Sequence, residues 1–176
     1  MSSNQSSINL AYLLIGSNIE PEKNLPEAVK LLARFGRIME HSSVWQSAAV
    51  GFTEQPDFLN ATVLLETDLS PKMLRLEAIQ KIEEALGRIR TANKNGPRTV
   101  DIDIILFNQD VLKLGNRLIP DPELLEQPYI AIPMAEIAPD YVHPEVHKTL
   151  KEIARQFNHN SEIMFKRDDV KLQGKG

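Results

Sequence analysis

The feature that most restricts the fold is the order of apolar and amphipathic segments between residues 10 and 107. Residues 10–15 form an unbroken apolar run that ends in Gly-Ser-Asn, which is typical of a buried strand stopped by turn residues. A helix is expected next, with Asn24 as its N-cap and Gly36 as a left-handed closing residue, because apolar residues recur at helical intervals between them. Extended stretches follow at residues 37–46 and 58–66, separated by a loop over residues 47–56.

A second helix and a fourth strand complete this pattern. Ser70 is expected to cap a helix with Pro71 at its first position, and Gly87 is expected to end it. A basic loop covers residues 88–97, and residues 99–107 alternate Asp and Ile, as a strand does when its two faces differ. The order is β-α-β-β-α-β, which predicts an α+β fold with a ferredoxin-like antiparallel sheet and helices packed on it.

The rest of the chain is expected to add smaller elements to this sheet. Proline-rich sequence from residue 108 onward predicts a C-terminal hairpin and short helices, the last at residues 148–157. His143 and His147, which flank a proline and a glutamate, are expected on the surface. No repeat or linker divides the chain, so we expect a flexible N-terminus at residues 1–9, a single domain at residues 10–160 and a C-terminal tail at residues 161–176, which is loose from residue 166 onward.

Composition excludes several classes of function. The chain has no cysteine, so disulfides and thiolate metal sites are ruled out. No apolar run approaches the roughly 20 residues of a membrane span, and the polar N-terminus does not look like a signal peptide, so we expect a cytoplasmic protein without membrane contact. The net charge is −4, yet basic residues gather between residues 81 and 98 beside two aspartates. This distribution favours a small phosphorylated ligand over nucleic acid, although charge alone leaves a solvated loop equally open.

Asp101 and Asp103 carry the clearest chemical signal. Alternate residues of a strand share a face, so the two carboxylates point the same way, roughly 7 Å apart at the backbone. Such a pair repels unless a cation compensates, and Mg²⁺ binds through one or two carboxylates plus water and phosphates. An exposed strand face with two solvated acids is the alternative. Arg88, Arg90 and Arg98 nearby favour phosphoryl-type transfer, because guanidinium groups bind phosphate oxygens.

Several motifs in a fixed order carry a resemblance to a known family. They are GSN at residues 16–18, GFTEQPDFLN at 51–60, IE and GRIR within 82–90, GPRTVDID at 96–103 and IPMAEIAP at 132–139. With this order and spacing, the chain resembles the 6-hydroxymethyl-7,8-dihydropterin pyrophosphokinase family over about residues 10–157. The resemblance implies an Mg²⁺-dependent enzyme of folate biosynthesis that transfers diphosphate from ATP to the pterin and releases AMP. The partners that it implies are the small-molecule pterin and ATP. We expect a monomer, but the sequence leaves the oligomeric state open.

The resemblance implies a role for each matching position. The residues implied for catalysis, with the two aspartates as metal ligands, are Arg88, Arg90, Arg98, Asp101 and Asp103. Those implied for the nucleotide are Gln80, Glu83, Arg90, Arg98 and Ile104. Those implied for the pterin, with an amide reading the heterocycle edge and two aromatic rings stacking on it, are Ser47, Val50, Phe58, Asn60 and Tyr129.

The chain departs from the family pattern near the expected nucleotide site. Asp121 stands where a histidine is usual, Gln127 where an arginine is usual, and residues 94–95 are Lys-Asn in place of an arginine and an aromatic residue. These departures leave open a divergent relative that binds pterin or nucleotide with an altered substrate or without turnover. A single-stranded RNA-binding module is a further alternative, which Asp101 and Asp103 on the sheet and the negative net charge oppose.

Overall fold

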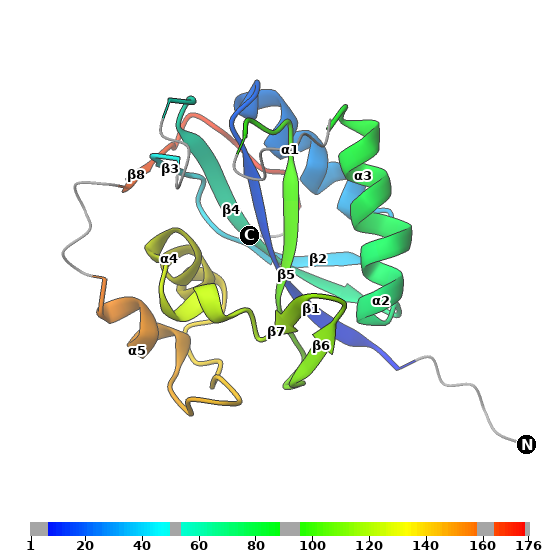
Figure 1. Cartoon of the computed structure of the whole chain (residues 1–176), viewed down its shortest axis with the longest axis vertical. Coiled ribbons are helices and arrows are strands. Elements are labelled where there is room, and N and C mark those ends of the chain that lie inside the picture. Colours follow the sequence, from blue (N-terminus) through cyan, green and yellow to red (C-terminus); the bar gives the residue numbers. More distant parts are fainter. Residues whose placement is uncertain (1–6, 50–53, 89–95, 158–163, 175–176) are drawn as a thin grey trace, which may run out of the picture.

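The fold is an antiparallel sheet with helices on both faces (Figure 1). The computed structural model describes residues 7–49, 54–88, 96–157 and 164–174. The strand order is β5-β1-β4-β3-β8, and β2 also pairs with β4. The six strands are β1 (Asn9–Ser17), β2 (Arg37–His41), β3 (Trp45–Ser47), β4 (Phe58–Thr67), β5 (Asp101–Phe107) and β8 (Met164–Lys166). A separate hairpin joins β6 (Leu112–Leu114) to β7 (Arg117–Ile119).

One face of the sheet is covered by α1 (Pro21–Leu32) and by one continuous helical stretch. That stretch runs through α2 (Pro71–Met73), a π-helical segment η1 (Leu74–Ile79) and α3 (Gln80–Ala85). Alternate residues of β1 point to this face, and Ala11, Leu13 and Ile15 are fully buried there in the main core cluster. Each such buried Leu or Ile side chain contributes about 1.5–3 kcal/mol through removal from water.

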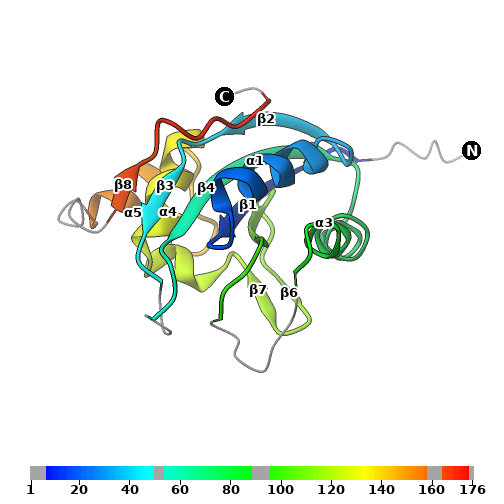
Figure 2. The same ribbon diagram turned by 90° about the horizontal axis from the view of Figure 1, so that it is seen from above.

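The opposite face is covered by η2 (Pro122–Leu125), α4 (Pro128–Ile137) and α5 (Leu150–Arg155). In both views α4 and α5 lie together, away from α3 (Figures 1 and 2). The β1 residues Tyr12 and Leu14 belong to this second core cluster. Within β4, Thr62 donates a hydrogen bond from Oγ1 to the Pro133 carbonyl of α4 at 2.8 Å.

The strand and helix order expected from the sequence is present. Two assignments at the ends of the first helix are wrong: the N-cap at Asn24 and the left-handed conformation at Gly36. Helix α1 begins at Pro21 after Glu20, a left-handed residue with φ 41°, and Asn24 lies inside the helix. Its amide donates to the Ile19 carbonyl at 2.6 Å, so it supports the helix from within and is not the N-cap. Gly36 does not adopt a left-handed conformation; a β-carbon there would lie 2.2 Å from the Glu66 carbonyl oxygen, so close approach to β4 requires glycine.

The extended stretch expected at residues 37–46 is broken into β2 and β3. At the break, the Ser42 N–H donates to the Thr62 carbonyl, and the Thr62 N–H donates to the Ser42 hydroxyl, both at 2.9 Å. A side-chain oxygen thus replaces a backbone acceptor, and the strand bends while both of its parts remain paired with β4. Ser70 caps its helix through Met73 N–H as expected, and Gly87 is left-handed with φ 79°.

The C-terminal segment is more ordered than the sequence suggested. Strand β8 pairs with β3, the Arg167 N–H donates to the Val44 carbonyl at 2.8 Å, and Val170 is buried in the main core. The expectation of a loose segment from residue 166 onward is therefore wrong for residues 166–170. The expected surface position is also wrong for His143, which is buried, while His147 is exposed. None of the helices in the described ranges has the length and apolar character that crossing a bilayer requires.

Candidate active site

Two rows of residues across the sheet form the floor of the site. Gly16 of β1 is in register with Asn60 of β4 on one side and with Asp101 of β5 on the other. Leu14, two residues earlier and on the same face, is in register with Asp103. Because the backbones of neighbouring strands lie about 4.8 Å apart, the Cα atoms of Asn60 and Asp101 are held roughly 10 Å apart. A β-carbon at Gly16 would lie 2.7 Å from Asn60 Oδ1, so the glycine leaves the centre of this floor open.

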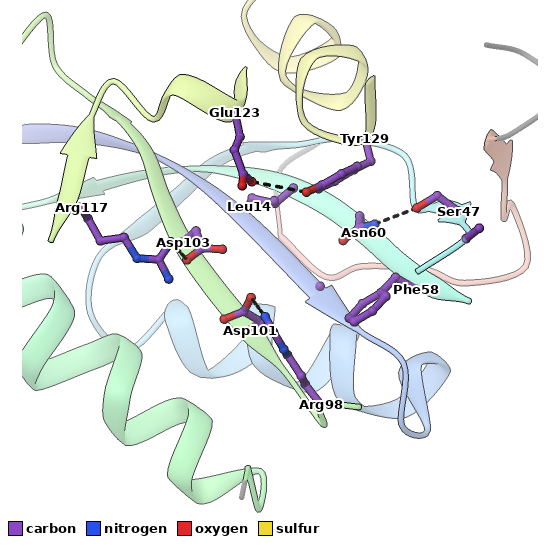
Figure 3. Close-up of a pocket in the computed structure, with 12 residues that line it drawn as sticks. Leu14, Ser47, Phe58, Asn60, Arg98, Asp101, Asp103, Arg117, Glu123 and Tyr129 are labelled. Carbon is purple, nitrogen blue, oxygen red and sulfur yellow. Dashed lines mark hydrogen bonds and ion pairs between the residues drawn. The ribbon is translucent and has the colours of Figure 1, made fainter. Parts of the chain in front are cut away.

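A cavity of about 300 Å³ lies over this floor (Figure 3). Phe58 and Tyr129 lie on either side of Asn60, and the Asn60 amide donates to the Ser47 hydroxyl at 3.3 Å (Figure 3). The cavity therefore combines two aromatic rings with an amide at one end and charged groups at the other. Its lining residues are Leu14, Gly16, Ser47, Ala48, Phe58, Asn60, Arg98, Asp101, Asp103, Arg117, Glu123 and Tyr129.

A second, smaller cavity of about 50 Å³ lies between β5 and the helical stretch that ends in α3. It shares Asp101, Asp103 and Arg117 with the first cavity, so the two aspartates stand where the cavities adjoin. Its lining residues are Arg75, Ile79, Gln80, Glu83, Arg88, Asp101, Ile102, Asp103, Ile104 and Arg117.

Arginines hold both aspartates from the sides. Arg88 Nη1 donates to Asp101 Oδ1 at 2.9 Å and also to the buried Glu83 carboxylate. Arg98 Nη1 donates to Asp101 Oδ2 at 2.6 Å. On the neighbouring aspartate, Arg117 Nη1 lies 3.2 Å from Asp103 Oδ1. Three guanidinium groups therefore surround the carboxylate oxygens of Asp101 and Asp103, and they provide fixed positive charge at the place where a further anionic group would bind.

The buried Glu83 and the half-buried Asp103 both have a raised pKa. Burial raises the pKa of Glu83, and the Arg88 charge opposes this shift. Burial, together with the negative charge of Asp101, raises the pKa of Asp103 to about 7. A carboxyl group with a raised pKa is less stable in its ionised form than a carboxyl group in water, and a nearby cation stabilises that ionised form.

The donor set fits a hard divalent cation. Asp101 and Asp103 both line the adjoining part of the two cavities, whereas no cluster of three or more His, Asp or Glu suited to a metal occurs among the described residues. A cation held by only two carboxylates must take its remaining oxygen ligands from water and substrate, which is the habit of Mg²⁺.

The structure separates the sequence-predicted residues into two groups. The residues implied for the pterin that it describes line the first cavity: Ser47, Phe58, Asn60 and Tyr129. Of those implied for the nucleotide, Gln80, Glu83 and Ile104 line the second cavity, and Arg98 lines the first. Arg88, Asp101 and Asp103 line the second cavity. The two remaining predicted residues, Val50 and Arg90, lie outside the described residues.

Arg75, Arg117 and Glu123 line the cavities but were not found from the sequence. Arg117 and Glu123 lie in the segment from β7 to η2. Neither residue belongs to a periodic pattern or to a motif named above, and the segment reaches the site because it folds beside β5. Tyr129 donates from its hydroxyl to Glu123 Oε2 at 3.4 Å.

The structure also explains one departure from the family pattern. Asp121 accepts a hydrogen bond at Oδ1 from the Glu123 N–H at 2.9 Å, and its own N–H donates to the Ile105 carbonyl. Asp121 is therefore the N-cap of η2 and lines neither cavity.

A buried asparagine ties three site segments together. Asn18, 3% exposed, donates from Nδ2 to Gln55 Oε1 at 2.7 Å and to the Pro56 carbonyl at 3.2 Å. Its Oδ1 accepts the Arg98 N–H at 2.8 Å. The loop after β1, the segment before β4 and the segment before β5 are thereby fixed relative to one another.

Comparison with known proteins gives one consistent result. The model of the 7,8-dihydro-6-hydroxymethylpterin-pyrophosphokinase family matches residues 12–139. The chain is similar to two proteins called 2-amino-4-hydroxy-6-hydroxymethyldihydropteridine pyrophosphokinase. That of Synechocystis sp. is 38% identical over 148 residues, which cover 83% of this chain and 75% of the relative. That of Bacillus subtilis is 39% identical over 132 residues, which cover 73% of this chain and 78% of the relative.

Longer proteins contain a similar region. A folic acid synthesis protein of Dictyostelium discoideum is 36% identical over 142 residues, which span 80% of this chain but only 21% of that protein. Among solved structures, wild-type Plasmodium falciparum HPPK-DHPS with pterin and p-hydroxybenzoate matches with a TM-score of 0.71 at 15% identity. The match covers 94% of this chain and 46% of the solved chain, and it shows a common fold.

Proposed function

The chain belongs to the 7,8-dihydro-6-hydroxymethylpterin-pyrophosphokinase family, and from this premise we propose that it transfers diphosphate from ATP to 6-hydroxymethyl-7,8-dihydropterin in folate synthesis. The observation that carries the proposal for the site is the position of Asp101 and Asp103 where two cavities of different character adjoin. A transfer between two substrates needs them in separate sites whose reacting ends meet, and this arrangement provides it.

The first cavity is the proposed pterin site. Phe58 and Tyr129 offer ring faces for a flat heterocycle, and the Asn60 amide offers a donor and an acceptor to its edge. The roughly 10 Å between Asn60 and Asp101 suits a fused two-ring heterocycle with a short substituent. A pterin read at its edge by Asn60 therefore directs its hydroxymethyl group toward the aspartates.

The second cavity is the proposed nucleotide site. Gln80 and the apolar Ile104 line it together with the charged residues that surround the aspartates. Arg88, Arg98 and Arg117 already contact Asp101 or Asp103, so a triphosphate at the same place lies within reach of three guanidinium groups. The Glu83 carboxylate holds the Arg88 guanidinium group in place through an ion pair.

The proposed reaction needs no nucleophile from the protein. The hydroxymethyl oxygen forms a bond to the β-phosphorus of ATP, the bond from that phosphorus to the oxygen of the α-phosphate breaks, AMP leaves, and the hydroxyl proton is released. Asp101 and Asp103 would hold Mg²⁺, which supplies neutralisation of phosphate charge and a lowered pKa of the attacking hydroxyl. The protein contributes position and fixed positive charge through the arginines.

Release of AMP tests this proposal. The unchanged protein, mixed with Mg²⁺, ATP and 6-hydroxymethyl-7,8-dihydropterin, should release AMP in step with pterin diphosphate, as followed by chromatography. Asp101→Ala and Asp103→Ala should each lower turnover by several orders of magnitude while the far-UV circular dichroism is unchanged. Asp110→Ala, an exposed aspartate beyond the end of β5, is the matched control and should keep full turnover. Turnover like that of the unchanged protein in either aspartate variant contradicts the metal assignment.

The proposal includes a monomer in the cytoplasm that acts on small molecules and does not bind nucleic acid. The negative net charge supports the last point. So does the packing of helices on both faces of the sheet, because sheets that bind single-stranded RNA expose one face for base stacking. Sedimentation equilibrium tests whether the protein is a monomer, and an RNA gel shift tests whether it binds nucleic acid. Binding of both ligands without AMP release would instead identify a divergent relative that has lost turnover.

A further inference from the structure

A π-helical turn changes which side chains of the helical stretch from α2 to α3 face the second cavity. In η1 the Gln80 N–H donates to the Arg75 carbonyl, a bond between residues five apart. In an α-helix, residues five apart point in directions about 140° different, because each residue turns the chain by about 100°. The π turn instead stacks Arg75 over Gln80. Such turns are rare and occur frequently at functional sites.

Arg75 consequently lines the second cavity together with Gln80 and Ile104. It is half-buried, and its side chain has no hydrogen bond or ion pair with another residue of the described ranges. The contrast with its neighbours is clear, since Arg88 and Arg117 in the same cavity are each bound to an aspartate. Arg75 is thus a positive, planar group in the cavity wall that the described fold does not itself engage.

Its position along the helix places it away from Asp101. The helical stretch runs opposite to β5, with α2 near the end of β5 and the end of α3 near its start (Figure 1). Glu83 lies near the C-terminal end of α3. It accepts a hydrogen bond at 3.4 Å from the N–H of Ile102, the residue next to Asp101. Arg75 precedes Glu83 by about two turns and so lies toward the other end of the cavity.

We propose that Arg75 is a nucleotide-specificity residue that contacts the base and ribose of ATP and leaves the triphosphate to the arginines around the aspartates. This inference rests on the proposed function, because it assigns the second cavity to ATP. A guanidinium group stacks on an aromatic base through cation–π attraction and donates hydrogen bonds to ribose hydroxyls. Ile104 in the same cavity offers an apolar surface to the base.

The test compares a nucleotide with its phosphate chain alone. Calorimetric titrations in the presence of Mg²⁺ would use α,β-methylene-ATP and inorganic triphosphate as probes. Arg75→Met keeps the length of the side chain and removes the guanidinium group. Its affinity for the analogue should fall about tenfold, within the range of cation–π contacts, while its affinity for triphosphate changes less than about twofold. Arg75→Lys should restore only part of the loss, because it lacks the planar group.

Lys81→Met is the matched control. It removes one positive charge from the same helical stretch, but Lys81 is exposed and pairs with Glu77 at 2.6 Å outside both cavities. It should leave both affinities unchanged. In turnover, Arg75→Met should raise the KM for Mg-ATP with little change in kcat, since the contact is made equally before and during transfer.

Each outcome decides the inference. Equal losses for the analogue and for triphosphate in Arg75→Met overturn it, because Arg75 would then act on phosphate. Unchanged affinity for the analogue also overturns it. If the unchanged protein binds the analogue and Arg75→Met shows the selective loss, the inference holds even where no AMP is released and the proposed function fails. Absence of any nucleotide binding by the unchanged protein overturns both.

Discussion

Replacing Asn18 with alanine should lower the free energy of unfolding by about 3 kcal/mol. The side chain makes three hydrogen bonds, to Gln55, Pro56 and the Arg98 N–H, and it is almost fully buried. A hydrogen bond of this kind contributes a net of about 1 kcal/mol, and the partners lose that contribution together because alanine replaces none of the bonds. The loss is a large share of the roughly 5–15 kcal/mol that a domain of ordinary stability has.

Urea unfolding followed by circular dichroism measures this loss, and thermal unfolding should show a drop of about 6–12 °C for a chain of this size. Asn116→Ala is the control, because Asn116 is exposed in the turn between β6 and β7 and its replacement should change stability by less than about 0.5 kcal/mol. The Asn18 variant should also release AMP more slowly at temperatures where it is fully folded, because Asn18 fixes the backbone of Arg98. A loss of stability below about 1 kcal/mol would refute the reasoning that this network holds the three segments.

Three further predictions concern the floor of the site, its aromatic wall and the pH dependence of stability. Gly16→Ala places a β-carbon 2.7 Å from Asn60 Oδ1, so pterin affinity in fluorescence titrations should fall about tenfold while binding of α,β-methylene-ATP is kept. Tyr129→Ala should weaken the pterin by about tenfold or more through lost stacking, whereas Tyr129→Phe, which loses only the 3.4 Å bond to Glu123, should stay within about threefold. Burial lowers the pKa of His143, so the unfolded chain takes up its proton first as the pH falls below about 6.5. The urea midpoint should therefore drop between pH 7 and pH 5 through this residue.

Matched variants separate these effects from general damage. Gly115→Ala adds a β-carbon in open space at φ 61°, so it should cost about 1 kcal/mol of stability without changing pterin affinity. His143 accepts hydrogen bonds at Nδ1 from the Glu145 and Val146 N–H groups, which requires the neutral ring. His143→Gln should remove part of the pH dependence, and His147→Gln, at an exposed position, should remove none. Equal pH profiles for the unchanged protein and His143→Gln would contradict the assignment.

Local signals predicted those parts of the fold that depend on neighbouring residues. The apolar run of β1, the Ser70 cap and the end of the helix at Gly87 all lie where the sequence indicates, because burial period, capping and helix termination are set within a few residues. The cap expected at Asn24 was wrong because a left-handed residue at Glu20 starts α1 earlier, a choice that helical periodicity does not reveal.

The site shows the same division. The shared face of Asp101 and Asp103 follows from the two-residue period of a strand, and both line the two cavities. Arg117 and Glu123 have no comparable signal, since their approach to the site depends on how the segment after β5 folds back. The π turn that brings Arg75 to the cavity is likewise invisible in a pattern of helix-forming residues.

The sequence by itself determined the succession of strands and helices and the paired carboxylates on one strand, because these properties are encoded in residues close together along the chain. Only the tertiary structure decided which residues surround those carboxylates. Pairing of β1 with both β4 and β5 brings Asn60 and Asp101 to opposite sides of Gly16, and pairing of β8 with β3 secures the C-terminal segment. Contacts between residues far apart in sequence depend on the packing of the whole domain, and local patterns do not contain them.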